Sequence, residues 1–301
     1  MSAPARVEVT VRLRVPVGGV VERRARLVEG AAGWGEWSPL PSWSPAEVAA
    51  AEEAAEQAAR HPFPAPRRAR VVVNAMVPRV APSLAARLAR ESGCGTVKVK
   101  VGDAEGAARV AAVRVAVGPR VRLRLDANSA WDVDTALAEL RRLAIHGVEL
   151  VEDPVGTLEE LAALRRRSPV PVAAEMSVRS VADARRLRAL DAADAVVLKP
   201  QRIGGVAVAL AAAAEAGVPA IASSALETSV GLTAVVALAA ALPGSPYAHG
   251  AGTALLLEED VTSDPLLPEA GELRARRVVP DLVVPGEGPP SHRARRRPER
   301  R

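Results

Sequence analysis

Short apolar runs alternate with longer segments of helical periodicity over most of the chain. Seven runs, mostly of Val, Ile, Leu and Ala, recur at near-constant spacing, and segments of 15–25 residues with apolar positions three and four apart separate them. The runs cover residues 71–74, 96–101, 122–128, 149–154, 170–176, 195–200 and 220–225. Repeated strand–helix units predict a parallel sheet with crossover helices, and seven of them favour closure into a (β/α) barrel, with residues 249–252 as a short eighth strand.

The first 66 residues follow a different pattern. Residues 6–30 form two alternating runs that the pair Gly18-Gly19 joins, which predicts two β-strands, and an alanine-rich helix is expected to begin after Ser44 with Pro45 at its first position. We therefore expect an α+β capping domain over residues 1–66, completed by about 254–287, beside a (β/α)7β (modified TIM) barrel over residues 67–253.

Composition narrows the class of protein. The chain has 301 residues of which 49% are hydrophobic, enough for a large packed core, and its single cysteine excludes a disulfide framework. No apolar run reaches the length of about 18 residues that a membrane-spanning helix needs, and the N-terminus lacks the apolar stretch of a signal peptide. We expect a soluble, cytoplasmic protein without a membrane partner, and the sequence leaves its oligomeric state open.

The basic isoelectric point of 10.2 comes from one end of the chain. Residues 291–301 contain six arginines and one glutamate, a net charge of +5, and the whole chain is also +5, so residues 1–290 are neutral overall. The pattern favours a disordered, arginine-rich tail over residues 288–301. With 2% aromatic residues the chain also lacks a stacking platform for bases, so no nucleic-acid partner is expected.

Lysine is scarce in a chain rich in arginine. Only Lys98, Lys100 and Lys199 are lysines, against 37 arginines among the 40 basic residues. A coding bias toward arginine explains the general excess, but lysine alone of the two can lose its proton near neutral pH when its surroundings depress the pKa. All three lysines fall in the predicted strand runs, which makes them candidates for proton transfer.

Polar side chains end each predicted barrel strand from the second onward. They are Lys98 and Lys100, Asp126 and Asn128, Glu152, Glu175, Lys199, and Ser223 with Ser224. Each of these motifs alone is also typical of a half-exposed strand, a turn or a loop entry. Their joint placement at successive strand ends, where barrels build active sites, favours a functional interpretation.

Three carboxylates that converge from neighbouring strands would repel one another without a cation between them. Asp126, Glu152 and Glu175 offer the hard oxygen ligands that Mg²⁺ prefers, and Mn²⁺ is able to substitute for it. With a lysine on either side, this pattern predicts proton abstraction next to a carboxylate, in which the metal holds the enolate and a lysine takes the proton.

These residues resemble the enolase superfamily, and within it the actinobacterial o-succinylbenzoate synthase family. The resemblance rests on KVKVG (98–102), LRLDAN (123–128), ELVEDP (149–154), VLKP (197–200), SSALETSVGL (223–232), GWGEWSP (33–39), VNAMVP (73–78) and HGAGTALLLEEDV (249–261). It covers nearly the whole chain to about residue 287. It implies an enolase-like fold and a carbon–oxygen lyase (hydro-lyase) of menaquinone biosynthesis that dehydrates SHCHC (2-succinyl-6-hydroxy-2,4-cyclohexadiene-1-carboxylate) to o-succinylbenzoate.

The resemblance also implies roles for single residues. Lys100 matches the base, which would return its proton to the leaving hydroxyl in a syn elimination, and Lys199 matches the lysine that stabilises the enolate. The Mg²⁺ ligands match Asp126, Glu152 and Glu175. The matches for supporting and substrate-binding residues are Lys98, Arg124, Asn128, Ser223 and Ser224.

One motif departs from the family pattern. The family usually has Asp-Glu-Ser at the end of the fifth strand, where this chain has Glu175-Met176-Ser177. Alignment on the following Ser-Val-Arg places Glu175 at the ligand position, whereas a register one residue out would place Ala174 there. Two alternatives to the synthase remain: an N-acylamino acid racemase or dipeptide epimerase of the same superfamily, and a non-catalytic relic of the fold.

Overall fold

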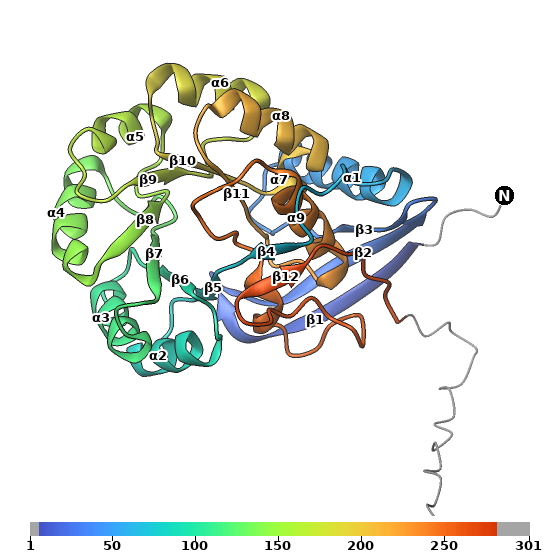
Figure 1. Cartoon of the computed structure of the whole chain (residues 1–301), viewed down its shortest axis with the longest axis horizontal. Helices are drawn as coiled ribbons and strands as arrows, with labels where there is room; N and C mark the ends of the chain where they lie inside the picture. Colours follow the sequence, from blue (N-terminus) through green and yellow to red (C-terminus); the bar gives the residue numbers. More distant parts are fainter. Residues whose placement is uncertain (1–5, 282–301) are drawn as a thin grey trace, which may run out of the picture.

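A computed structural model describes residues 6–281 of the chain and arranges them in a strongly curved parallel sheet with an antiparallel sheet beside it (Figure 1). The antiparallel sheet consists of β1 (Arg6–Val17), β2 (Val20–Gly30) and β3 (Gly33–Trp37). Gly18 and Gly19 both have positive φ in the turn between β1 and β2, a conformation that favours glycine. The two predicted strands are confirmed, whereas β3 lies in a Pro/Gly/Trp-rich stretch that the sequence pattern left without an element.

The helix α1 (Pro45–Arg60) begins where the sequence predicts. Ser44 is its N-cap, Pro45 occupies the first turn, and Glu47 completes a capping box in which its side chain accepts from the Ser44 backbone N–H. Its buried face of alanines packs against β2 and β3, and it also contacts α7 of the barrel unit. The helix therefore joins the antiparallel sheet to the barrel.

The parallel sheet has the order β11-β10-β9-β8-β7-β6-β5. Its strands are β5 (Ala75–Val77), β6 (Thr96–Lys100), β7 (Arg122–Asp126), β8 (Val148–Glu152), β9 (Val172–Ala174), β10 (Ala195–Leu198) and β11 (Ala220–Ala222). The connecting helices are α2 (Pro82–Glu91), α3 (Gly106–Val117), α4 (Val133–Leu143) with the 3₁₀ turn η1 (Ala144–His146), α5 (Leu158–Arg165), α6 (Val181–Leu190), α7 (Pro200–Ile203), α8 (Val206–Ala216) and α9 (Ser229–Ala241). Helices α2–α6 and α8 lie on the outer side of the curved sheet (Figure 1). This arrangement confirms the predicted barrel.

Residues 249 and 250 close the sheet between its two edge strands. His249 forms a parallel bridge with Val73, and Gly250 forms one with Ser223. The His249 side chain strengthens the seam, because its Nδ1 accepts from the backbone N–H of Ala222 at 3.1 Å. The predicted eighth strand is thus present as two bridged residues, and from Gly252 the chain turns into the 3₁₀ segment η2 (Gly252–Leu256).

The first predicted barrel run divides into two strands. Residues 70–72 form β4 (Arg70–Val72), which pairs antiparallel with β12 (Glu272–Arg274), and the barrel strand itself is β5, three residues further on. The expectation that residues 71–74 form the first barrel strand was therefore wrong in position. The polar Asn74 lies in the break, but other predicted barrel runs also end in a polar residue, so periodicity alone did not mark it.

The chain returns to the first sheet after the barrel. Leu257 forms an antiparallel bridge with Leu13 of β1, and Leu13, Val11, Leu226, Leu256 and Leu257 form a small apolar cluster. The domain boundaries at residues 66 and 253 stay a prediction. The predicted disordered tail over residues 288–301 lies outside the described residues.

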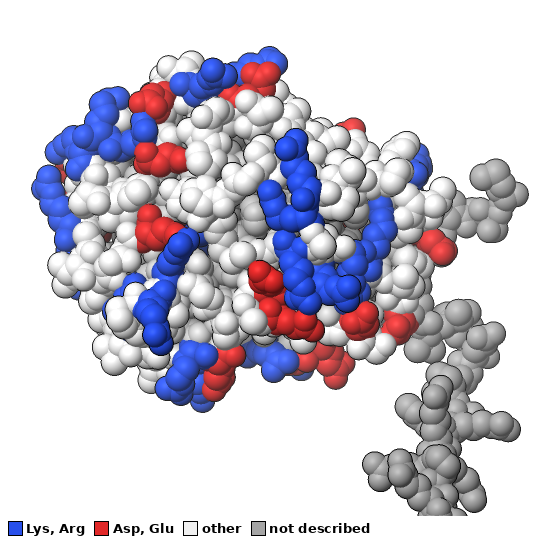
Figure 2. All heavy atoms as spheres, viewed as in Figure 1, with Lys and Arg blue, Asp and Glu red and all other residues white. Residues whose placement is uncertain are grey.

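Charges of both signs are interspersed over the face of the molecule in Figure 2, with one band of Lys and Arg side chains across the region of β4 and β12. This mixture agrees with the zero net charge of residues 1–290. Among residues 6–281, the structure contains no helix long and apolar enough to cross a membrane.

Candidate active site

The predicted site residues gather at the carboxyl ends of the parallel strands. Lys98 and Lys100 lie on β6, Asp126 and Glu152 are the last residues of β7 and β8, and Glu175 directly follows β9. Lys199 follows β10, and Ser223 and Ser224 follow β11. Because side chains alternate along a strand, Lys98 and Lys100 point to the same side, and both contact Asp126 on the neighbouring strand.

Lys98 sits between two carboxylates. Its Nζ lies 2.6 Å from Glu152 Oε2 and 3.1 Å from Asp126 Oδ2, and only 5% of the residue is exposed. Burial works to lower the pKa of Lys98, but the charges of Glu152 and Asp126 outweigh it and raise the pKa above the ordinary value. Lys98 is therefore a fixed positive charge.

The surroundings of Lys100 shift its pKa in the opposite direction. Its Nζ lies 2.7 Å from Asp126 Oδ2 and 2.8 Å from Asn128 Oδ1. Burial lowers the pKa of Lys100 below its ordinary value, Lys98 and Lys199 lower it further, and Asp126 opposes the shift without cancelling it. Although these lysines are two residues apart on one strand, their pKa values are shifted in opposite directions.

Lys199 faces Lys100 from the other side of the carboxylates. Its Nζ lies 2.8 Å from Glu175 Oε2, and the other oxygen of Glu175 accepts from Arg202 Nη1 at 3.0 Å. Burial works to raise the pKa of Glu175, but Lys199 and Arg202 hold it below the ordinary value, against the charge of Asp126. Glu175 is thus an ionised carboxylate held from both sides.

Arg202 connects the site to the helix α1. Its Nε donates to Glu47 Oε1 at 2.6 Å, and Glu47 also pairs with Arg179 at 3.3 Å. Burial works to raise the pKa of Glu47, but hydrogen bonds from Ser44 and Arg202 lower it to about 2. Sequence reasoning missed Arg202 and Glu47, because Glu47 has the local role of a capping residue and its partner is 155 residues away.

Asp153 is a third residue that the sequence pattern did not single out. Its carboxylate accepts from the backbone N–H of Glu175 at 2.8 Å and of Met176 at 2.9 Å, which fixes the chain at the end of β9. Burial and the neighbouring charge of Glu175 raise the pKa of Asp153 to about 8. Its position directly after Glu152 was the available signal.

The end of β9 bears on the open question of register. Ala174 is the last residue of β9 and has no side-chain oxygen, whereas the Glu175 carboxylate lies among Lys199 and Arg202. Met176 is half-buried, and its sulfur accepts from Ser129 Oγ at 3.9 Å. The geometry supports the alignment that gives the ligand position to Glu175.

The remaining predicted residues lie at different depths. Arg124 is fully buried two residues before Asp126, where it donates to Glu149 Oε2 and to the Ala248 carbonyl, both at 2.7 Å. Ser224 pairs with Thr253 through their hydroxyls at 2.7 Å and accepts from the Leu226 backbone N–H. Ser223 is buried beside Gly250 at the barrel seam. Arg124 therefore contacts groups that lie deeper in the barrel than the three carboxylates at the strand ends.

The donor set of the three carboxylates suits a hard divalent cation. Asp126, Glu152 and Glu175 are buried and provide oxygen atoms at three adjacent strand ends. Among residues 6–281 no three metal-binding side chains are arranged to hold a metal ion, and Lys98, Lys100 and Lys199 pair with these carboxylates. A divalent cation would also supply positive charge to these carboxylates, and their oxygen atoms are ligands of the kind it prefers.

Comparisons with known proteins agree with this fold. Residues 81–288 match the family model described as Enolase C-terminal domain-like, and residues 8–59 match Enolase N-terminal domain-like. Solved structures give the same fold: the L-Ala-D/L-Glu epimerase from Bacillus subtilis is 23% identical with a TM-score of 0.78, over 90% of this chain and 95% of that one. The dipeptide epimerase from Enterococcus faecalis V583, complexed with Mg and dipeptide L-Leu-L-Tyr, is 23% identical with a TM-score of 0.78, over 92% of this chain and 98% of that one. The chain belongs to the enolase superfamily.

Its curated relatives define the family more narrowly. The o-succinylbenzoate synthase of Thermobifida fusca (strain YX) is 52% identical over 273 residues, which cover 89% of this chain and 86% of that protein. The o-succinylbenzoate synthase of Mycolicibacterium smegmatis (strain ATCC 700084 / mc(2)155) is 43% identical over 280 residues, 91% of this chain and 86% of that protein. The chain is a member of the o-succinylbenzoate synthase family.

Proposed function

We propose that this chain is an o-succinylbenzoate synthase, a hydro-lyase of menaquinone biosynthesis that converts SHCHC to o-succinylbenzoate and water. The observation that carries the proposal is the 52% identity to a curated o-succinylbenzoate synthase over 89% of the chain. The site agrees with it, because two lysines face each other across buried carboxylates at the strand ends.

Lys100 is the base in this proposal. Its surroundings lower the pKa of Lys100, which makes the neutral amine easier to reach, and that amine abstracts the proton next to the substrate carboxylate. Asp126 and Asn128 orient Nζ through hydrogen bonds of 2.7 and 2.8 Å. The ammonium of Lys100 then returns the proton to the leaving hydroxyl, so that water departs and the ring of the product becomes aromatic.

Lys199 lies on the opposite side, where its amino group stabilises the negative charge that develops on the substrate. Lys98 adds a fixed positive charge beneath the carboxylates. Asp126, Glu152 and Glu175 would hold Mg²⁺, which when bound supplies positive charge for the substrate carboxylate. Ser223 and Ser224 are proposed to contact the succinyl side chain.

The direct test is an assay of the purified chain with SHCHC and Mg²⁺ in which the formation of o-succinylbenzoate is followed. An N-acylamino acid and a dipeptide serve as comparison substrates, since racemases and epimerases of the superfamily use the same two lysines. We expect rapid dehydration of SHCHC. Turnover of the amino acid derivative or dipeptide without dehydration would instead assign the chain to the alternative function, and no turnover of any of them would favour the relic.

A further inference from the structure

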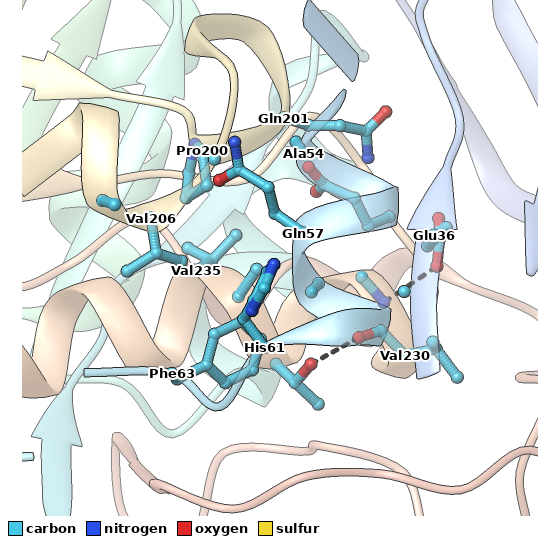
Figure 3. A pocket seen from close by; sticks show the side chains of 18 of the residues that line it. Glu36, Ala54, Gln57, His61, Phe63, Pro200, Gln201, Val206, Val230 and Val235 are labelled. Carbon is cyan, nitrogen blue, oxygen red and sulfur yellow. Dashed lines mark hydrogen bonds between the residues drawn. The ribbon is translucent and has the colours of Figure 1, made fainter. Parts of the chain in front are cut away.

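Helix α7 begins directly after Lys199 and lies between the barrel and the capping unit, which we define as β1–β3 with α1. All residues of this short helix are buried, and it packs against α1. Figure 3 shows Pro200 and Gln201 of α7 at the wall of a cavity that Ala54 and Gln57 of α1 also line. The capping unit is therefore in contact with the helix that follows the lysine at the end of β10.

Two polar side chains of α7 contact the capping unit. Gln201 Oε1 accepts from the Ser38 backbone N–H at 2.8 Å, directly after β3. Arg202 Nε donates to Glu47 Oε1 at 2.6 Å, in the first turn of α1. Arg202 reaches further, because its Nη1 also donates to Glu175 Oε1 at 3.0 Å. One guanidinium thus joins the capping unit to a proposed ligand of the divalent cation.

Glu47 uses its two carboxylate oxygens for different tasks. Its Oε2 accepts from the backbone N–H and the hydroxyl of Ser44 at 2.8 and 2.7 Å, which completes the capping box of α1. Its Oε1 accepts from Arg202 and lies 3.3 Å from Arg179 Nε. Glutamine also occurs at this position of capping boxes, so the start of the helix does not require a charge. The charge of Glu47 is therefore available for two arginines of the barrel.

The Glu175 carboxylate is held by cations on both of its oxygens. Lys199 Nζ lies 2.8 Å from Oε2, and Arg202 donates to Oε1. A glutamate loses much rotamer freedom when it is fixed, and contacts on both oxygens keep its carboxylate in one place. Arg202 is 8% exposed and Glu47 is 6% exposed, so little water screens the charges of this pair. A change of charge at Glu47 should therefore be felt at Glu175.

We propose that Glu47 is a positioning residue of the candidate active site: it fixes the guanidinium of Arg202, and through Arg202 it sets how freely Glu175 binds a divalent cation. The capping unit thus helps to form the cation site without supplying a ligand. The inference rests on the proposed function, which assigns Glu175 to the cation.

Loss of the charge at Glu47 should weaken cation binding for two reasons. Arginine keeps its proton at any working pH, so Arg202 would direct its charge to Glu175 alone and compete with the cation for that carboxylate. The positive charge that Glu47 balances would also repel the cation itself. Removal of a residue that orients a metal ligand typically costs about 10–100-fold in metal affinity.

The test is binding of Mn²⁺ to the full chain, measured by electron paramagnetic resonance without substrate. Glu47→Gln keeps a side chain suited to the capping box and removes the charge, and we expect its Kd for Mn²⁺ to rise at least about tenfold. The spectrum of bound Mn²⁺ should also change in shape, because it responds to the arrangement of the ligands. The control is Glu52→Gln, the same substitution on the same helix, whose ion-pair partner Arg26 belongs to the capping unit. Its Kd should stay within about twofold of the parent, because this pair is partly exposed and lies within one unit.

A double variant separates positioning from a general loss of stability. With Arg202→Gln as the background, Glu47→Gln should change the Kd for Mn²⁺ less than about twofold, because the residue through which Glu47 acts is gone. Proteins tolerate replacement of both partners of a buried ion pair better than loss of one. The comparison of the double variant with Arg202→Gln therefore remains decisive if Glu47→Gln alone does not fold.

Four outcomes would each overturn the proposal. They are an unchanged Kd in Glu47→Gln, an equal loss of affinity in Glu52→Gln, a loss of affinity from Glu47→Gln that persists in the Arg202→Gln background, and a parent protein that binds no Mn²⁺. The measurement needs no SHCHC. A parent protein that binds Mn²⁺ as expected but does not dehydrate SHCHC would therefore count against the proposed function and leave this inference standing.

Discussion

Two layers inside the barrel contain buried ion pairs, and lysine occurs only in the upper one, where Arg202 also pairs with Glu175. At the carboxyl ends of the strands, Lys98 and Lys100 contact Asp126, and Lys199 contacts Glu175. One layer deeper, the cation is Arg124, which contacts Glu149 at 2.7 Å. Arginine keeps its proton at any working pH, whereas lysine can release its proton when burial and positive neighbours depress the pKa. Lys100, whose surroundings lower its pKa, therefore makes the upper layer the place where a proton is expected to move.

The carboxylates of the upper layer should be the least tolerant of change. Asp126→Ala removes the partner of two lysines and a proposed Mg²⁺ ligand, so we expect no detectable dehydration of SHCHC. Circular dichroism should show a folded protein, and binding of Mn²⁺ measured by electron paramagnetic resonance should weaken. Full activity of the parent protein in excess chelator would contradict the metal-dependent account.

The next effect concerns Lys199. Lys199→Ala removes the charge that pairs with Glu175 and should lower kcat about 10²–10⁴-fold. Lys199→Arg keeps a cation at this position and should retain part of the rate, because the proposed role is electrostatic. Equal loss in the two variants, measured as kcat with SHCHC, would show that more than the positive charge of Lys199 is needed.

A substitution in the deeper layer should lower the stability of the fold more than the rate of the reaction. Arg124→Met leaves Glu149 with only the exposed Arg122 as a partner, and removal of one partner of a buried ion pair costs up to about 3–5 kcal/mol in the free energy of unfolding. Urea denaturation measures the stability, and the rate per folded molecule should fall far less than in Lys199→Ala. A large fall in rate with unchanged stability would move Arg124 into the catalytic layer.

The smallest expected change is Glu175→Asp. Aspartate keeps the carboxylate and matches the residue that the family usually has here, so we expect kcat within about threefold of the parent. Asp153 holds the backbone at Glu175 and Met176 and should preserve the strand end in this variant. The control is Glu175→Ala, which should lose most of the activity; if it is harmless, the alignment of Glu175 with the ligand position is wrong.

The sequence predicted the features that repeat locally. Strand periodicity and the Ser44-Pro45 helix start are properties of neighbouring residues, and they place the lysines and carboxylates at the strand ends where the structure has them. The break between β4 and β5 was missed, because it depends on pairing with β12 about 200 residues away. The contact of Arg202 with Glu47 was missed for the same reason, since nothing near either residue marks the other.

The central claim is that Lys100, and not a cation in general, is the base. The most direct measurement is kcat for dehydration of SHCHC by the parent, Lys100→Arg and Arg124→Lys across pH, with folding checked for each protein. We predict that the parent rate rises with pH as Lys100 loses its proton, that Lys100→Arg falls at least 10²–10⁴-fold at every pH, and that Arg124→Lys stays within about tenfold. Near-normal turnover of Lys100→Arg would contradict the account.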